Sequence, residues 1–459
     1  MKYYIDPFGC VKNQVDAENM MAHLRNAGWE CVADAESSDL IIINSCGFIE
    51  SAKQESINAV LQWRKLFPEK KILLAGCLAQ RYAKELPGIL PEADIFMGTE
   101  NPAQIIQAAE KTRYSSFNSQ LPAIKKTTYN PELLTGERPI LSLPGSAYVK
   151  ISEGCDNRCS YCAIPLIRGG LVSRSIPDIV EECRSLLLRG IKELCIIGQD
   201  IGAFGAEMQR NNTENNLPEL LNAISALDGY FWVRLLYIHP DHFPLQILDL
   251  MERDKRFLPY FDIPFQHASA EILTAMNRNR LLKKPPAEKY LELIKSIRAR
   301  SHGAVIRSTF LLGFPGETKE DFAVLLDFQE KAALDWLGCF VYSREEGTKS
   351  YSMKRRVSAK TAVMRKQIIE EKQISITEKN MKRFEGCELD VLIEEKIDAK
   401  KTDVHNGDNS IWLGRSYFQA PDIDGSIVIT GSGENLKTGV FYKCGIIASR
   451  GFDLEARVL

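Results

Sequence analysis

The chain has 459 residues, a formal net charge of −2 and 26% charged residues, which is typical of a soluble globular protein with several domains. This near-neutral balance excludes a general electrostatic attraction to nucleic acid or to an anionic membrane. The N-terminus lacks a basic stretch followed by a long apolar run, and no segment approaches the roughly 18 apolar residues of a spanning helix. We therefore expect a cytoplasmic protein with no membrane partner, in which clustered cysteines bind metal rather than form disulfides.

Residues 1–112 alternate between strand and helix patterns. The strand candidates are KYYIDPFGC, DLIIINSC, KILLAGC and ADIFMG, separated by helical segments such as VDAENMMAHLRNAG. Apolar strands that alternate with helices predict an α/β domain with a mostly parallel sheet covered on both faces. Residues 113–140 are rich in Ser, Thr, Pro and Lys, which predicts a linker.

Residues 141–376 repeat the strand–helix pattern over a longer distance. The six strand candidates are AYVKISEG, KELCIIGQD, WVRLLYIHP, LPYFDIPFQ, AVIRSTFLLG and WLGCFVYS. Six such units predict a partial barrel of the TIM type that is open at one side. A long charged helix at about 358–384 follows, and residues 377–449 carry short strands that predict a small antiparallel β-barrel.

Three cysteines, Cys155, Cys159 and Cys162, fall in the loop after the first strand of the predicted barrel. Active sites of such barrels lie at the C-terminal ends of the strands. Three thiolates are one fewer than a structural zinc or a closed four-iron cluster requires. We interpret the spacing as a four-iron cluster with one iron open to a small molecule. The alternative is a three-thiolate zinc site completed by a distant residue.

Cys10, Cys46 and Cys77 each stand at the carboxyl end of a predicted strand in the N-terminal domain. Those ends line the ligand crevice of an open α/β sheet, so we expect the three thiols to converge. Each has a glycine beside it, which permits tight turns and close approach of the backbone to a ligand. We interpret them as a second cluster with an open iron, against the alternative of three unrelated buried cysteines. The other six are predicted to be small buried apolar side chains: Cys31, Cys183, Cys195, Cys339, Cys387 and Cys444.

The motifs around both cysteine sets resemble those of the radical S-adenosylmethionine (SAM) methylthiotransferases over nearly the whole chain. They are GCVKNQVDAE, INSCGFIESAKQESI and GCLAQRY, then KISEGCDNRCSYCAIPLIRG, and finally PYFDIPFQHAS, FLLGFPGET and YSREEGT. The resemblance implies a cluster-bearing N-terminal domain, a radical SAM barrel and a C-terminal TRAM domain. The chain departs from the family at Val11, where a proline is usual, and at Ile201 and Gly202, where threonines are usual. These departures concern substrate fit, because the cysteines are unchanged.

The resemblance implies that SAM takes the open iron of the barrel cluster. One electron from an external reductant then splits SAM into methionine and a 5′-deoxyadenosyl radical, which can take hydrogen from an unactivated carbon. No side chain is expected to act as a catalytic acid or base. Tyr161 is expected to lie against the adenine, Gln199 to contact the methionine or ribose part of SAM, and the backbone at Gly313 to lie near the adenine.

The barrel residues other than Tyr161 also have a structural alternative. Gln199 and Asp200 could cap the next helix, and Gly313 could form a simple turn. Gln266 and His267 are candidates to face the substrate, but a buried structural histidine is an equally good interpretation.

Within the family, FQHAS, REEGT and LGRSYFQAPDIDG are most similar to the RimO-type branch. This implies a methylthio group added to the β-carbon of an aspartate in ribosomal protein S-twelve, free or in the small subunit. It also implies two SAM per turnover, two [4Fe-4S] clusters, a sulfur donor and a flavodoxin- or ferredoxin-like electron donor. Residues 378–459 hold 14 acidic and 11 basic side chains, a net of −3, which suits a basic protein better than a phosphate backbone. The alternatives are a MiaB-type transfer-RNA methylthiotransferase and a non-catalytic iron–sulfur or zinc regulator.

Overall fold

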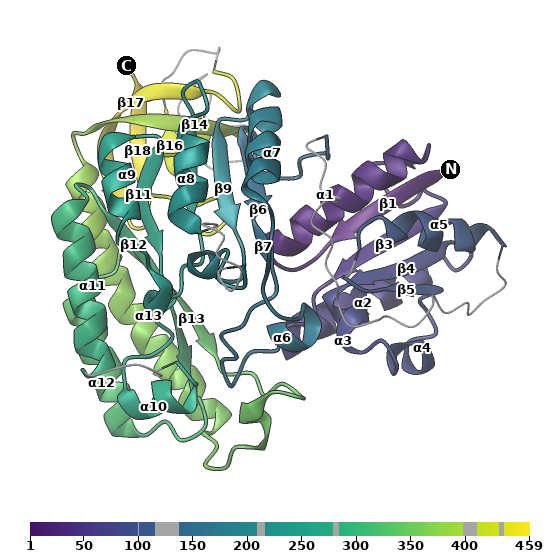
Figure 1. Ribbon diagram of the computed structural model, residues 1–459, viewed down its shortest axis with the longest axis horizontal. Coiled ribbons are helices and arrows are strands. Elements are labelled where there is room, and N and C mark those ends of the chain that lie inside the picture. The colour runs from purple at the N-terminus through teal and green to yellow at the C-terminus, as the bar shows by residue number, and fades with distance from the viewer. Residues whose placement is uncertain (100, 115–136, 209–215, 279–283, 398–410, 431–435) are drawn as a thin grey trace. The chain divides into compact units, whose positions relative to one another are not determined.

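The computed structural model describes all residues except 100, 115–136, 209–215, 279–283, 398–410 and 431–435 (Figure 1). The chain divides into two compact units. Unit 1 comprises residues 1–141, 150–182 and 343–352, and unit 2 comprises residues 142–149, 183–342 and 353–459. Among the described helices, none combines the length and apolar character that a membrane crossing requires.

Unit 1 contains a five-stranded parallel sheet in the order β2-β1-β3-β4-β5. Its strands are β1 (Lys2–Pro7), β2 (Glu30–Cys31), β3 (Leu40–Ser45), β4 (Lys71–Gly76) and β5 (Ile95–Met97). The four strands predicted from the sequence are therefore confirmed, and β2 is an additional two-residue strand at the edge. All six residues of the central strand β3 are buried, as expected for a strand covered on both faces.

Helices cover both faces of this sheet (Figure 1). They are α1 (Val11–Asn26), α2 (Glu50–Leu66), α3 (Cys77–Arg81), α4 (Leu86–Ile89) and α5 (Gln104–Tyr114). Consecutive strand residues point to opposite faces. Accordingly Ile42 packs in the cluster that includes α1 and α5, whereas Ile43 packs in the cluster that includes α2, α3 and α4.

The remainder of unit 1 holds the second cysteine set in a loop closed by glycines. The elements are β7 (Ser152–Glu153), α6 (Ile164–Ile167), β8 (Val172–Ser173), the start of α7 (Ile176–Leu188) and the 3-10 turn η5 (Lys349–Ser352). β7 and β8 pair in antiparallel fashion and bring the loop ends together. A Cβ at Gly154 would lie 2.0 Å from the carbonyl oxygen of Gly170, so only glycine permits this closure.

The predicted linker, 113–140, lies largely outside the described residues. Near its end Arg138 is fully buried and ion-paired with Glu18 and with Glu182, the latter at 3.0 Å. The end of this segment is therefore anchored in unit 1.

Unit 2 contains the six-stranded sheet expected for the partial barrel, in the order β13-β12-β11-β10-β9-β6. Its strands are β6 (Ser146–Lys150), β9 (Glu193–Ile197), β10 (Trp232–Leu235), β11 (Phe257–Asp262), β12 (Val305–Leu312) and β13 (Trp336–Val341). All six predicted strands are confirmed, in chain order, with β6 and β13 at opposite edges. The helices are α8 (Leu217–Ser225), α9 (Ile247–Arg253), α10 (Ala270–Ala275), α11 (Pro286–Arg300), α12 (Lys319–Ala332) and α13 (Ala359–Met381).

The C-terminal strands close into a small barrel in the order β14-β15-β16-β18-β17. They are β14 (Glu388–Ile397), β15 (Ile411–Arg415), β16 (Ile427–Ile429), β17 (Phe441–Arg450) and β18 (Asp453–Val458). The neighbours pair in antiparallel fashion except β16 and β18, which are parallel, and this differs from the wholly antiparallel prediction. The small C-terminal barrel extends beyond residue 449, where the sequence predicted its end, because β18 spans Asp453–Val458.

The stretch LGRSYFQAPDIDG fastens this small barrel to the strands of the six-stranded sheet. Arg415 Nη2 lies 2.7 Å from Glu193 Oε2 at the start of β9, and Arg415 Nε lies 2.6 Å from Glu394. Arg234 of β10 also binds Glu193 through Nε at 2.7 Å and donates to the Tyr417 carbonyl at 2.8 Å.

Further contacts with the same stretch come from β11 and β13. Tyr260 donates its hydroxyl to Asp424 at 2.6 Å, and Trp336 Nε1 donates to the Phe418 carbonyl at 2.7 Å. The stretch interpreted from the sequence as a branch marker is thus mostly buried, and its contacts lie inside unit 2.

The six remaining cysteines follow the sequence expectation in part. Cys183, Cys195, Cys339 and Cys444 are buried, whereas Cys387 is intermediate and Cys31 is exposed. The expectation of burial was wrong for Cys387, which is partly exposed, and for Cys31, which lies on the short edge strand β2, where both residues face solvent.

Candidate metal centre

Cys10, Cys46 and Cys77 lie at one edge of the unit 1 sheet. Cys10 precedes α1 directly after β1, Cys46 follows β3, and Cys77 begins α3 after β4. Because β1, β3 and β4 are adjacent and parallel, their carboxyl ends share this edge. The three thiols are close enough to influence one another electrostatically. The structure thus brings together three residues that are far apart in sequence.

The glycines beside these cysteines leave space for close approach. A Cβ at Gly9 would lie 3.3 Å from Cys46 Sγ, and a Cβ at Gly47 would lie 2.7 Å from the carbonyl carbon of Cys77. Gly9 and Gly76 also have φ values of +93° and +96°, which other residues rarely adopt. Three soft thiol donors beside glycines that lack side chains fit an iron–sulfur cluster.

Asn13 holds the three cysteine loops together. Its Nδ2 donates to the carbonyls of Phe8 at 3.2 Å and Ser45 at 3.0 Å, and its Oδ1 accepts from Cys77 Sγ at 3.3 Å. Asn13 is fully buried, and Asn44 donates to its carbonyl at 2.6 Å. Sequence reasoning missed this residue, although an amide in the first turn of the helix that Cys10 caps was an available signal.

Cys155, Cys159 and Cys162 lie together in the loop between β7 and β8, and all three are partly exposed. The Cys155 N–H donates to the Gly169 carbonyl at 3.2 Å, and the Cys162 N–H donates to the Cys159 carbonyl at 3.1 Å. Tyr161, expected to lie against adenine, is in this loop and is also partly exposed. Partial exposure leaves this set accessible to a ligand.

No three His, Cys, Asp or Glu side chains in the described ranges converge closely enough to hold a single metal ion. In a four-iron cluster each cysteine binds a different iron, so its ligands are spaced more widely than those of one ion. The absence of a single-ion site among the described residues is therefore compatible with both cysteine sets as cluster ligands.

A buried ion-pair network connects the two cysteine sets within unit 1. Arg168, in the second cysteine loop and 3% exposed, binds Glu153 at 2.9 Å and Asp16 at 2.8 Å. Lys150 also binds Glu153, at 2.8 Å, and pairs with Asp16. The Nη2 atom of Arg168 lies 3.2 Å from Cys77 Sγ and can donate to it. An arginine from one cysteine loop thus reaches a candidate ligand of the other set.

The protonation of these groups follows from burial and charge. Burial raises the pKa of the Cys77 thiol to about 12, although the Arg168 charge opposes this rise. Burial also acts to raise the pKa of Glu153, but Arg168 and Lys150 outweigh it and lower that pKa to about 2. Glu153 is therefore ionised at neutral pH, and a metal that binds Cys77 must displace a proton.

The REEGT stretch is held against helices α2 and α3 of unit 1. Glu345 is 2% exposed and binds Lys53 at 3.0 Å and Arg81 at 2.7 Å. The Ser350 N–H donates to the Ser160 carbonyl, inside the second cysteine loop, at 2.8 Å. Sequence reasoning used this stretch only as a family marker. The structure shows that Glu345 pairs with residues of α2 and α3, whereas the contact with the cysteine loop comes from Ser350, two residues beyond the stretch.

The other expected SAM contacts lie in unit 2. Gln199 follows β9 and is partly buried, and the next residue, Asp200, caps the turn η2 (Ile201–Ala203) by accepting from the Gly202 N–H at 3.1 Å. The capping interpretation is confirmed for Asp200.

Gly313 follows β12 with φ +76°, and a Cβ there would lie 2.4 Å from the Cβ of Ala362. Close packing by itself therefore requires glycine at this position.

The surroundings of His267 favour the structural interpretation of this residue. It is fully buried, and its Nδ1 accepts from the Ser269 N–H at 3.0 Å. Burial lowers the pKa of His267 to about 3, so the ring is neutral.

Two residues near strand ends have a strained backbone. Gln266, which precedes His267, and Tyr237, which follows β10, both have a φ of +68°. Such strained conformations cluster at functional sites. Sequence reasoning did not foresee this strain.

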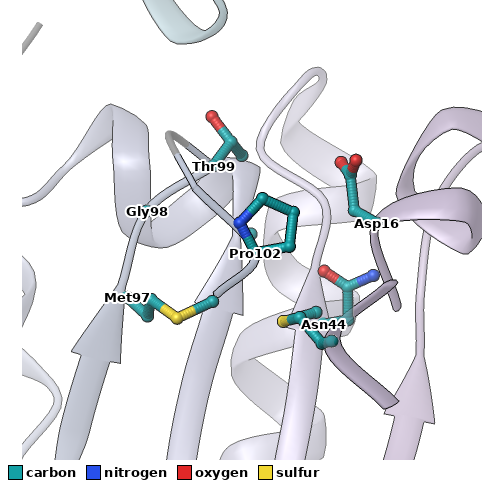
Figure 2. Close-up of a pocket in the computed structure, with 8 residues that line it drawn as sticks. Asp16, Asn44, Met97, Gly98, Thr99 and Pro102 are labelled. Carbon is teal, nitrogen blue, oxygen red and sulfur yellow. The ribbon is translucent and has the colours of Figure 1, made fainter. Parts of the chain in front are cut away.

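A small pocket adjoins the first cysteine set and is shown in Figure 2. Its lining is Asp16, Met20, Asn44, Gly76, Met97, Gly98, Thr99 and Pro102. Its cavity volume of about 10 Å³ is that of roughly one water molecule. It is therefore too small for a peptide, nucleotide or SAM.

Comparison with known proteins assigns the three parts of the chain. Residues 2–98 match the uncharacterized protein family UPF0004, residues 149–328 the radical SAM superfamily and residues 386–459 the TRAM domain. The fold is also similar to that of the radical SAM methyltransferase TsrM from Kitasatospora setae, with a TM-score of 0.51 at 14% identity over 74% of this chain and 72% of that one. The fold and the cysteine loop thus define a radical SAM enzyme.

Relatives along the whole chain specify the family. A ribosomal protein uS12 methylthiotransferase RimO of Treponema denticola is 46% identical over 98% of this chain and 99% of its own length. Its counterparts in Pseudothermotoga lettingae and Thermotoga maritima are 38% and 35% identical, each over 100% of both chains. The chain therefore belongs to the RimO-type family of radical SAM methylthiotransferases.

Proposed function

We propose that this enzyme adds a methylthio group to the β-carbon of an aspartate in ribosomal protein uS12, in the cytoplasm, and uses two SAM molecules per turnover. The substrate is taken from the names of the full-length relatives. The β-carbon and the two SAM molecules follow from resemblance and chemistry. A methylene C–H bond is too weakly acidic for a general base, so its functionalisation calls for a radical.

The observation that carries the proposal is that both cysteine sets occur in one compact unit and are joined by Arg168. Two centres, each with three protein ligands, suit a reaction that must both generate a carbon radical and deliver sulfur. When bound and reduced by the external electron donor, a cluster with an open iron would pass on the one electron that splits SAM reductively.

The chain's own residues have distinct parts in this proposal. Cys155, Cys159 and Cys162 would hold the SAM-binding cluster, and Tyr161 would lie against the adenine. Cys10, Cys46 and Cys77 would hold the cluster that handles sulfur, with Asn13 fixing the geometry of their three loops.

Gln199 and Gly313 remain proposed contacts of SAM. Both follow strands of the unit 2 sheet at their carboxyl ends, where barrels of this type bind their ligands. The proposal also includes a sulfur donor and a flavodoxin- or ferredoxin-like electron donor.

Iron analysis and a product assay test the proposal. Anaerobically reconstituted protein should contain about eight irons, as two four-iron clusters. With SAM, sulfide and a reductant, uS12 or its small subunit should gain the mass of an S–CH3 group in place of hydrogen, located on the aspartate by fragmentation.

Transfer RNA serves as the matched alternative substrate. Methylthiolated adenosine in transfer RNA, with uS12 unchanged, would refute the substrate and favour a MiaB-type activity. One zinc in place of iron would refute the chemistry and favour a regulator.

A further inference from the structure

Arg168 is fixed to the backbone of the second cysteine loop. It lies six residues after Cys162. Its N–H donates to the Ile164 carbonyl at 2.7 Å, and the carbonyl of the adjacent Gly169 accepts from the Cys155 N–H at 3.2 Å. The backbone of Arg168 is therefore hydrogen-bonded within the loop that carries the second cysteine set.

The guanidinium of Arg168 is oriented by acceptors on both sides. Nη1 lies 2.9 and 3.0 Å from the two carboxylate oxygens of Glu153. Nη2 lies 2.6 Å from Asn13 Oδ1, 2.8 Å from Asp16 Oδ2 and 3.2 Å from Cys77 Sγ. Such a planar fork, held by charged acceptors, is a rigid donor toward the sulfur.

The charges around Arg168 balance before any thiolate is counted. Arg168 and Lys150 are the two cations, and Glu153 and Asp16 are the two carboxylates. Removing the arginine charge would leave this buried network with a net negative charge beside Cys77.

We propose that Arg168 is a positioning residue for the cluster bound by Cys10, Cys46 and Cys77. Its guanidinium donates to Cys77 Sγ at 3.2 Å and thereby raises the reduction potential of that cluster. Reduction adds negative charge, and both a nearby cation and an N–H donor to a ligand sulfur stabilise the reduced form. This inference rests on the proposed N-terminal cluster.

The test uses the full chain with C155A, C159A and C162A, so that the remaining cluster signal arises from the N-terminal cysteines. In this parent, R168Q and R168K are compared by iron content and by a redox titration followed by electron paramagnetic resonance. R168Q should shift the ratio of oxidised to reduced cluster at a fixed potential about tenfold toward the oxidised form, about 59 mV for a one-electron couple. R168K should restore most of this shift because it keeps the charge.

R174Q is the matched control. Arg174 is likewise a buried arginine near the end of this loop, but it pairs with Glu182 and donates to the Lys150 carbonyl at 2.9 Å. R174Q should lower stability without moving the midpoint potential.

Each outcome decides the inference. Full iron content with an unchanged midpoint in R168Q, or an equal shift in R174Q, overturns it. Loss of the four irons in R168Q with retention in R168K supports charge-dependent holding of the ligand, whereas equal loss in both variants overturns it. A parent that binds no iron contradicts the proposed function instead.

Discussion

Units 1 and 2 each bury a network of arginine and glutamate side chains, but the two networks have different surroundings. In unit 1, Arg168 and Glu153 lie beside the thiol of Cys77. In unit 2, Arg415 and Glu193 join the small C-terminal barrel to the strands of the six-stranded sheet. Removing one partner of a buried ion pair is costly in either place. The two networks therefore differ in one respect: in unit 1 a donor reaches the sulfur of a candidate cluster ligand, whereas the unit 2 network joins two parts of the fold.

The largest expected effect comes from replacing the cysteines of each set with alanine. C10A/C46A/C77A should abolish methylthio product while 5′-deoxyadenosine still forms, because the SAM-binding set is intact. C155A/C159A/C162A should abolish both. Chromatography of the nucleoside and mass spectrometry of uS12 measure the two products.

C183A/C444A, at two buried cysteines outside both sets, is the control and should retain both products. Methylthio product formed by C10A/C46A/C77A would contradict the proposal that these three cysteines hold the sulfur-handling cluster. Wild-type release of 5′-deoxyadenosine by C155A/C159A/C162A would remove the radical assignment.

A second prediction compares E153Q with E193Q. Each leaves a buried arginine facing a neutral amide, so each should lower the free energy of unfolding by about 3 kcal/mol. Only E153Q should also lower iron content, because only Glu153 orients the arginine that reaches Cys77. Urea unfolding and iron analysis measure the two effects. Equal iron loss in E153Q and E193Q would contradict the prediction that only the network around Glu153 affects cluster binding.

Glycine substitutions sharpen the comparison within unit 1. G47A should reduce iron content and cost about 1–3 kcal/mol of stability through overpacking, because its Cβ would lie 2.7 Å from the Cys77 carbonyl group. G88A is the control, since a Cβ at Gly88 would meet nothing within 4 Å. Thermal unfolding and iron analysis measure both variants, and a G47A protein with full iron would show that the cradle tolerates a methyl group.

The smallest effect concerns the pH dependence of unit 2. Burial acts to raise the pKa of Glu193, but Arg415 and Arg234 lower it from 4.5 to about 2. A depressed carboxyl pKa contributes stability that is complete above pH 4.5 and is lost as pH falls toward 2. The unfolding free energy should therefore change with pH by up to about 1.4 kcal/mol per unit more in wild type than in E193Q within this window. Unfolding curves at pH 5.5, 4.5 and 3.5 measure the difference, and parallel pH profiles would contradict it.

Much of the fold follows from local pattern. The four main strands of unit 1 and all six strands of the partial barrel were predicted because buried parallel strands are short apolar runs between helices. The parallel pairing of β16 with β18 was missed, because pairing partners distant along the chain leave no local signal.

The two cysteine sets differ in how much of each site the sequence reveals. Cys155, Cys159 and Cys162 are neighbours along the chain, so their spacing alone indicated a shared site. Cys10, Cys46 and Cys77 could be grouped only through the inference that three parallel strands end at one edge. The structure gives that edge its order, β1-β3-β4.

By itself the sequence determined which residues are the candidate cluster ligands, because thiols and their glycines are properties of residue type and local spacing. Only the tertiary structure decided which groups orient those thiols. Asn13, Arg168 and Glu153 become neighbours of Cys77 through side-chain contacts between distant segments. It also decided that LGRSYFQAPDIDG is mostly buried against the barrel strands. Burial and ion pairing depend on what the rest of the chain places opposite a residue, and sequence spacing does not encode this.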